Sequence, residues 1–173
     1  MRRVTFGCAS SLDNFIARKH HEVDWLLWSD EVAALVSEYW QSFDTVLMGR
    51  KTYDVALKSG TPAYPGVKNY VFSRTLKESP DKRVKLVSEN AVEFLRQLKK
   101  KKGKGICIMG GGELGRSFLE ADLIDEIGVN IHPVLLGSGI PLFYKMKRQI
   151  DLELKECRML PQGCVYLLYN VKR

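Results

Sequence analysis

Hydrophobic residues along the chain form short β-branched or apolar runs that alternate with segments of helical spacing. The runs predict strands over 2–10, 44–49, 67–74, 83–88, 105–109 and 123–136, then a hairpin of 152–160 and 164–172 that turns at Pro161, Gln162 and Gly163. Helical spacing predicts a helix that begins near Asp30 as its N-cap, and others over 91–101 and 113–121. Nothing interrupts this alternation, so residues 1–173 are predicted to form a single α/β domain.

The composition agrees with one compact core and adds an excess of positive charge. The chain has 173 residues, of which 45% are hydrophobic, and a formal net charge of +7. Such a charge favours an anionic partner, which could be nucleic acid, an anionic membrane or a phosphorylated small molecule. Much of the excess lies in "KKKKGK", Lys99–Lys104, which we interpret as the solvated, cationic end of a helix.

The cysteines and the N-terminus indicate a location rather than a site. Cys8, Cys107, Cys157 and Cys164 fall in apolar, strand-like stretches without C-x-x-C or Cys/His ligand spacing. They are predicted to be buried free thiols in a reducing compartment, with no metal site. No apolar run matches a signal peptide or a membrane span, so we expect a soluble, cytoplasmic protein without a membrane partner.

A glycine run in "CIMGGGELGRSF" (107–118) raises the question of a dinucleotide fingerprint. Gly110, Gly112 and Gly115 satisfy G-x-G-x-x-G, in which glycines allow a pyrophosphate to approach a helix N-terminus. In a Rossmann unit the match follows the first strand and precedes a full crossover helix, with an acidic residue about 20 positions later. Here it follows residue 105, the helix is short, and Asn130 occupies the acidic position. We therefore reject the Rossmann interpretation.

Five motifs, in order, resemble those of the dihydrofolate reductase-like superfamily. They are "SLDNFIA" (11–17), "VLMGRKTYD" (46–54), "VFSRT" (71–75), "IMGGGELGRSFLEADLIDEI" (108–127) and "HPVLLGSGIPLF" (132–143). They are most similar to the branch that contains the riboflavin-biosynthesis reductase domain and small stand-alone relatives. The resemblance implies a twisted, mostly parallel sheet with flanking helices, completed by an antiparallel C-terminal hairpin, with NADPH across the carboxyl ends of the strands.

The resemblance assigns two of these motifs to the cofactor phosphates. Gly49 ends a strand, and Arg50, Lys51 and Thr52 open a helix whose free N–H groups and cations suit an anion. The segment Ser73–Thr75 resembles the one that holds the adenosine 2′-phosphate. Within it, Ser73 is a polar contact and Arg74 is the charge that separates NADPH from NADH.

The same resemblance explains the glycine run. Gly110 and Gly111 correspond to the pair whose peptide bond is cis in this fold, where side chains would block the cofactor. The amides of Gly111, Gly112, Glu113 and Leu114 would then face the pyrophosphate, and Glu113 would complement the helix dipole.

The substrate side offers two candidate carboxylates. Asp30 lies in the helical region where a folate reductase carries its proton-donating carboxylate, although Asp also suits an N-cap and no Trp-x-x-Pro-x-Asp signature precedes it. Asp13 resembles a loop carboxylate at the pocket mouth in the riboflavin branch, with Asn14 in place of the usual glycine. Trp25, Trp28 and Trp40 are candidates for a platform under a flat ring or for core positions. No histidine is assigned to catalysis.

Two classes of function follow. The first is an NADPH-dependent reductase that transfers hydride to a small heterocycle, pyrimidine-, pterin- or flavin-like. The second is a non-catalytic nucleotide- or nucleic-acid-binding protein on the same fold, although no aromatic-basic RNA motif supports nucleic acid as a partner. The zinc-binding signatures of a deaminase domain are absent, which argues against a bifunctional chain. The resemblance and the apolar C-terminal half imply a homodimer.

Overall fold

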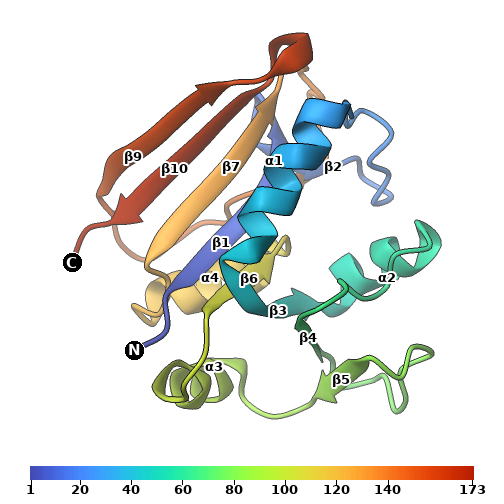
Figure 1. The fold of residues 1–173 in the computed structure, drawn as a ribbon, viewed down its shortest axis with the longest axis vertical. Helices are drawn as coiled ribbons and strands as arrows, with labels where there is room; N and C mark the ends of the chain where they lie inside the picture. Colours follow the sequence, from blue (N-terminus) through green and yellow to red (C-terminus); the bar gives the residue numbers. More distant parts are fainter.

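The protein, described over residues 1–173 by a computed structural model, is built on one eight-stranded sheet (Figure 1). The strands are β1 (Val4–Ser11), β3 (Phe43–Gly49), β4 (Lys68–Phe72), β5 (Val84–Val87), β6 (Gly105–Met109), β7 (Glu126–His132), β9 (Leu152–Met159) and β10 (Val165–Val171). The helices are α1 (Asp30–Gln41), α2 (Arg50–Lys58), α3 (Ala91–Lys100) and α4 (Gly112–Glu120). A 3-10 turn, Pro161–Gly163, joins the last two strands at the predicted position.

The strand order is β5-β4-β3-β6-β1-β7-β10-β9. The first six strands pair in parallel, and β10 and β9 complete the sheet in the antiparallel sense. The mostly parallel sheet with its antiparallel C-terminal hairpin is therefore confirmed. A parallel arrangement brings the carboxyl ends of β1, β3, β4 and β6 to one edge, where ligands bind in open α/β sheets.

Helices cover both faces of the sheet (Figure 1). On one face, α3 and α4 pack Leu95 and Phe118 against Phe6 and Leu47, within the larger hydrophobic core. On the other face, α2 buries Tyr53 against the alternate residues of β3, and α1 lies across β1. The alternation of side chains along each strand supplies both cores, which is why the central strands are apolar runs.

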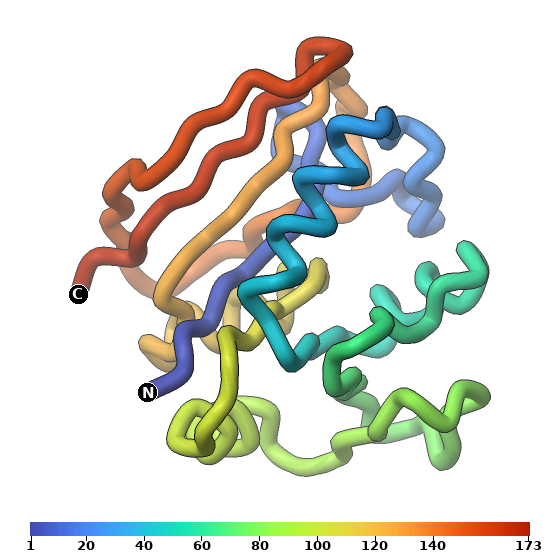
Figure 2. The backbone as a smooth tube through the Cα atoms, in the orientation of Figure 1, coloured from blue at the N-terminus to red at the C-terminus, as the bar shows by residue number.

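Both ends of the chain lie on the same side of the molecule (Figure 2), and residues near each end bind the carboxylate of Asp125. Its carboxylate accepts hydrogen bonds from the Val4 amide, the Lys99 ammonium group and the Arg173 guanidinium. Lys99 is only 6% exposed, and its Nζ also donates to the carbonyl of Leu123 at 2.9 Å. The prediction that Lys99–Lys104 is wholly solvated is therefore wrong at Lys99, because the helix turns that one lysine towards an internal acceptor.

Three local details also differ from prediction. The cap of α1 is Ser29, whose Oγ accepts from the Val32 amide at 3.2 Å, so Asp30 lies one position inside the helix and is exposed. The strand predicted over 123–136 begins at Glu126 and ends at His132, because Pro133 cannot continue the ladder. Two short strands, β2 (Phe15–Ala17) and β8 (Ile140–Pro141), pair outside the main sheet and were too short to predict.

The cysteines are all free thiols, as predicted, but they are not all buried. Cys107 and Cys164 are buried and Cys8 is half-buried, whereas Cys157 is exposed on the edge strand β9. The prediction is wrong at Cys157 because the sheet has no further strand or helix beyond β9 to cover it. None of the helices has the length and apolar character that a membrane span requires.

Candidate functional site

A cavity of about 1460 Å³ opens along the carboxyl edge of the sheet and continues under α1. Its wall contains all eleven residues that the resemblance assigned to the cofactor: Gly49, Arg50, Lys51, Thr52, Ser73, Arg74, Gly110, Gly111, Gly112, Glu113 and Leu114. Strand register explains why they meet. Met48 of β3 pairs with Met109 of β6, and Gly49 pairs with Phe72 of β4, so the three segments that follow these strands begin side by side.

Two helix N-termini without side-chain caps face the cavity at the carboxyl edge of the sheet. The α2 helix begins after Gly49 and α4 begins after Gly111, and neither N-cap residue has a side chain that accepts from the first turn. The first turn of α2 contains no acidic residue, whereas that of α4 contains Glu113. Unpaired N–H groups and the positive ends of two helix dipoles therefore meet where the phosphates of a dinucleotide are expected.

The glycine run makes its turn with left-handed backbone rather than with a cis peptide. No peptide bond in the protein is cis, so the predicted cis bond between Gly110 and Gly111 is wrong in this structure. These residues have φ of +58° and +71°, and two consecutive left-handed glycines complete the turn with trans peptides. A Cβ on Gly110 would lie 3.2 Å from Thr52 Oγ1, so the glycines are also needed for the close approach of the two helix N-termini.

The end of β4 contributes the second cationic segment. Ser73 is 8% exposed, and its Oγ accepts from the amides of Thr75 and Leu76 at 3.3 and 3.0 Å. This side chain therefore shapes the turn that presents Arg74 to the cavity. Arg74 and Lys51 have no ion-pair partner, whereas the Arg50 Nε donates to Asp54 Oδ1 at 2.7 Å.

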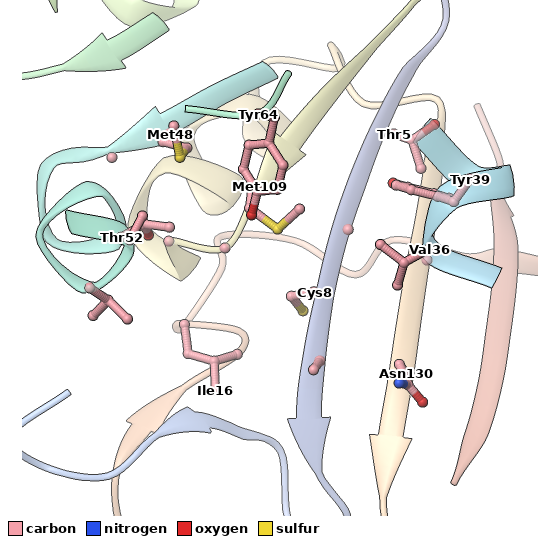
Figure 3. Close-up of a pocket in the computed structure, with 18 of the residues that line it drawn as sticks. Thr5, Cys8, Ile16, Val36, Tyr39, Met48, Thr52, Tyr64, Met109 and Asn130 are labelled. Atoms are coloured by element: carbon pink, nitrogen blue, oxygen red, sulfur yellow. The ribbon is translucent and has the colours of Figure 1, made fainter. Parts of the chain in front are cut away.

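The middle of the cavity is apolar and aromatic (Figure 3). Side chains from β1, α1, β3 and β6 line it, together with a loop tyrosine and one carboxamide from β7: Cys8, Val36, Tyr39, Met48, Tyr64, Met109 and Asn130. Tyr39 lies over Gly7, where a Cβ would approach its hydroxyl oxygen to 2.5 Å, and this hydroxyl lies 3.5 Å from Cys107 Sγ. Gly7 thus makes room for an aromatic side chain on the cavity wall.

The ionisable groups of this middle section stay neutral near pH 7. Burial raises the pKa of the Cys8 thiol and of the Tyr64 hydroxyl to about 12 in each case. Burial also raises the pKa of Tyr39 well above its usual range. The section therefore offers hydrogen-bonding hydroxyl and amide groups but no charge.

Asp13 does not line the cavity. It joins two loops at the carboxyl edge, since its carboxylate accepts from the Ser11 hydroxyl at 2.6 Å and from the amides of Leu136 and Gly137 at 3.1 and 2.7 Å. These bonds, first that of Ser11, hold the pKa of the carboxyl below its usual range. Asp13 would have to break these hydrogen bonds to take a direct part in catalysis, so its catalytic role stays a prediction.

Asp30 is exposed at the start of α1 and is also outside the cavity wall. Its catalytic role, like that of Asp13, stays a prediction. The tryptophans divide between the cavity wall and the core. Trp28 and Trp40 line the cavity, with Trp40 stacked on Tyr64 at 4.3 Å, whereas Trp25 is buried edge-on against the His132 ring.

Sequence reasoning missed most of the apolar wall. Tyr39, Tyr64, Met48 and Met109 belong to helix, loop and strand segments whose pattern resembles that of ordinary core. Only the position of Met48 and Met109 as the last or next-to-last residue of a parallel strand could have indicated the site, because such positions border the binding crevice. The tyrosines carried no such signal.

Comparison with known proteins identifies relatives over the whole chain. The model of a family described as the RibD C-terminal domain matches residues 2–166. The uncharacterized protein YwjB of Bacillus subtilis (strain 168) is 37% identical over 165 residues, which cover 94% of each chain. The uncharacterized protein YyaP of the same organism is 34% identical over 181 residues, covering 98% of this chain and 95% of the relative.

Solved structures share the fold. A Shewanella sp. PV-4 protein named for riboflavin biosynthesis has a TM-score of 0.84 and 30% identity, and the match covers all of both chains. A bifunctional deaminase and 5-amino-6-(5-phosphoribosylamino)uracil reductase from Thermotoga maritima has a TM-score of 0.73 and 16% identity, over 99% of this chain and 57% of that one. At this identity the second match supports the fold alone, which is the predicted dihydrofolate reductase-like α/β fold.

Proposed function

Because the chain belongs to the RibD C-terminal domain family, we propose that it is an NADPH-dependent reductase of a small heterocyclic substrate. The observation that supports this proposal is the arrangement of two uncapped helix N-termini beside two unpaired cations in one cavity. Two phosphate sites are needed for NADPH. The α2 and α4 N-termini suit the pyrophosphate, and Lys51, Ser73 and Arg74 suit the additional 2′-phosphate.

The glycines at the start of α2 and α4 also leave room for the phosphates of NADPH. Glycines occupy both N-caps, and the hydrogen of Gly111 takes the place of a Cβ that would lie 3.5 Å from Thr52 Oγ1 and 4.0 Å from the Gly49 amide nitrogen. Main-chain N–H groups can therefore contact a phosphate directly. The adjoining apolar section suits a flat ring system, which needs stacking and few polar contacts.

The protein supplies binding, orientation and exclusion of water. NADPH, when bound, provides a hydride, which carries two electrons and one hydrogen. The second hydrogen of a reduced acceptor is a proton, which we assign to solvent water. Burial raises the pKa values of Cys8, Tyr39 and Tyr64, and burial lowers the pKa of His132, which also lines the cavity, so all four groups stay neutral. Met48, Met109 and Tyr39 shape the wall against which the acceptor ring would lie.

The first experiment is calorimetric titration of the purified protein with NADPH and with NADH. We expect tighter binding of NADPH, because the unpaired cations Lys51 and Arg74 can contact its extra phosphate. Equal affinities would contradict the proposed cofactor.

A panel of pyrimidine, pterin and flavin acceptors, monitored at the nicotinamide absorbance, then tests the reaction. Repetition with Asp13→Asn and Asp30→Asn tests the predicted carboxylates. Loss of turnover with unchanged NADPH affinity would support a carboxylate, whereas unchanged turnover in both variants would remove both from catalysis. If NADPH binds and no acceptor is reduced, a cofactor-sensing role replaces the reductase.

Ionic strength separates the reductase from the nucleic-acid-binding alternative. Affinity for a nucleic acid falls steeply with salt because counterions are released, whereas binding in a cavity with apolar walls depends less on salt. Steeply salt-dependent binding of RNA without NADPH binding would favour the alternative.

We also propose a homodimer. The edge strand β9 exposes Leu154 at 54% and Met159 at 90%, and no element of the chain covers this face. An unpaired strand edge that carries exposed apolar side chains is a site of association that a partner copy would bury. Light scattering that shows a monomer at micromolar concentration would contradict it.

A further inference from the structure

The cations that line the cavity are distributed unevenly along it. Six lysines and arginines contribute to the wall: Arg3, Arg50, Lys51, Arg74, Lys155 and Arg158. Only Lys51 and Arg74 have no acidic partner, and both lie at the end with the uncapped helix N-termini. If NADPH binds there, its phosphates use both free cations.

The far end of the cavity, between α1 and the C-terminal hairpin, carries charges that are already paired. Glu126 is 6% exposed and accepts from Thr5 Oγ1 at 3.0 Å, from Arg3 at 2.8 Å and from Lys155 at 2.6 Å. Arg158 forms ion pairs with Glu156 and, at 3.4 Å, with Glu38.

This far end is electrically balanced. It contributes three cations, Arg3, Lys155 and Arg158, and three carboxylates, Glu38, Glu126 and Glu156. A phosphate placed there would have to compete with a carboxylate for every cation, and the displaced carboxylate would be left without a partner. For buried Glu126 this displacement is especially unfavourable.

The section between the two ends carries no charge. The polar and sulfur groups that contact this space are thioether, thiol, phenol, hydroxyl and carboxamide side chains (Figure 3), together with the imidazole of His132, whose pKa burial lowers. A phosphate dianion would lose its hydration there without gaining a cation, whereas an uncharged conjugated ring would lose little and would gain stacking against aromatic and sulfur-containing side chains.

We propose that the acceptor of this protein is an uncharged, planar, conjugated molecule without a phosphate group. This inference rests on the proposed reductase function and narrows its substrate class. The ring lies in the apolar section, and any polar neutral substituent, such as a chain of hydroxyl groups, extends to the paired charges of the far end, which offer hydrogen bonds without net charge. Reduction adds one hydride from NADPH and one proton from water, so the acceptor needs no ionised group.

Riboflavin and riboflavin 5′-phosphate form a matched pair of probes, since they share the ring and the hydroxyl chain and differ only in the phosphate. Their binding to the protein saturated with NADP⁺ is measured by quenching of flavin fluorescence. We expect riboflavin to bind at least about tenfold more tightly than its phosphate. Equal or tighter binding of the phosphate would overturn the proposal, and so would failure of both probes to bind.

Variants that remove a far-end carboxylate leave its cation partner unpaired. They test the charge argument through a change in affinity, which does not depend on how tightly either flavin binds to the wild type. Glu126→Gln leaves Arg3 and Lys155 without a carboxylate, and the double variant Glu38→Gln/Glu156→Gln does the same for Arg158, using more exposed positions that threaten folding less. We expect tighter binding of riboflavin 5′-phosphate by about tenfold, with riboflavin unchanged.

Glu153→Gln is the matched control, because it removes the same charge from β9 outside the cavity wall. If phosphate binding improves equally in the control, or in none of the folded variants, the charge argument is wrong. Calorimetry with NADPH alone runs in parallel. Failure of the wild type to bind NADPH contradicts the proposed function, whereas NADPH binding with a preference for the phosphorylated flavin contradicts only this inference.

Discussion

Two pairs of helices in this protein begin in different ways. Ser29 caps α1 and Asn90 caps α3, with the Asn90 carboxamide oxygen accepting from the amides of Val92 and Glu93 at 3.0 and 3.2 Å. The α2 and α4 helices begin after Gly49 and Gly111, which provide no side-chain acceptor. The capped helices start away from the glycine turn, whereas the uncapped ones start beside each other at the cavity.

The two pairs of helices differ in how the free main-chain N–H groups of their first turns are satisfied. Every helix N-terminus leaves main-chain donors without internal partners, and a side-chain cap is the usual solution. At α2 and α4 no N-cap side chain accepts from these donors, and Lys51 and Arg74 line the same cavity. An anionic ligand would then complete these two helices as Ser29 and Asn90 complete the others.

The largest expected effect comes from Gly111→Ala. The residue has φ of +71°, and its Cβ would enter the space between the two uncapped N-termini. We expect NADPH affinity to fall by about two orders of magnitude, equivalent to losing about two charge-assisted hydrogen bonds, and stability to fall by about 1–2 kcal/mol. Calorimetry and urea unfolding measure the two effects.

Gly137→Ala is the control for this variant. Gly137 has φ of +70°, a Cβ added there would meet no atom within 4 Å, and the residue does not line the cavity. The same backbone strain should therefore reduce stability without changing NADPH affinity. A folded Gly111→Ala protein with wild-type affinity would refute the phosphate assignment of the glycine turn.

Arg74→Ala should have the next largest effect. Removal of an unpaired cation should weaken NADPH binding by roughly 1–3 kcal/mol and leave NADH binding nearly unchanged. Arg83→Ala, which removes an exposed arginine paired with Asp81, is the control. A comparable loss for both cofactors would mean that Arg74 does not contact the 2′-phosphate.

Gly49→Asp converts an uncapped helix into a capped one. A Cβ at Gly49 meets no atom within 4 Å, and φ of −77° is ordinary for any residue. We expect a gain in stability of a few tenths of a kcal/mol together with about tenfold weaker NADPH binding, because the new carboxylate occupies the donors and repels phosphate. Gly49→Asn provides the cap without the charge and should weaken binding less. Unchanged NADPH affinity in both variants would place the phosphates elsewhere.

Asn90→Ala tests one of the two capped helices, α3. Loss of the α3 cap should cost about 1 kcal/mol of stability, measured by urea unfolding. NADPH affinity should not change, since Asn90 is not part of the cavity wall. A parallel loss of affinity would show that the two pairs of helices are coupled.

The smallest expected effect is on the pH dependence of stability, and it concerns Asp13, a carboxylate that binds main-chain amides within the protein itself. Asp13 accepts from the amides of Leu136 and Gly137, and its pKa is lowered in the folded state. Its carboxylate therefore stabilises the fold above the usual pKa of an aspartate, near 3.8, and this contribution is lost as the pH falls through the lower folded value. The stability difference between wild type and Asp13→Asn should be constant above about pH 5 and shrink as the pH falls from there to about pH 2. A constant difference would contradict the hydrogen bonds.

The motifs predicted the end of the cavity with the uncapped helix N-termini much better than its apolar wall. Gly49–Thr52, Ser73–Arg74 and Gly110–Leu114 are contiguous segments that follow strands, so strand order alone was enough to bring them together. Cys8, Tyr39, Tyr64 and Met109 come from separate elements and meet only in three dimensions. Their residue types do not distinguish a binding wall from a core.

The sequence by itself determined the alternation of strands and helices, the position of the glycine turn and the segments that face the carboxyl edge. These features depend on local periodicity and on backbone freedom, both of which are properties of short stretches. Only the tertiary structure decided which charges remain free. Lys99 is paired inside, Arg3, Lys155 and Arg158 are balanced by carboxylates, and Lys51 and Arg74 are not. Ion pairing depends on distances between residues far apart in the chain, which no local pattern contains.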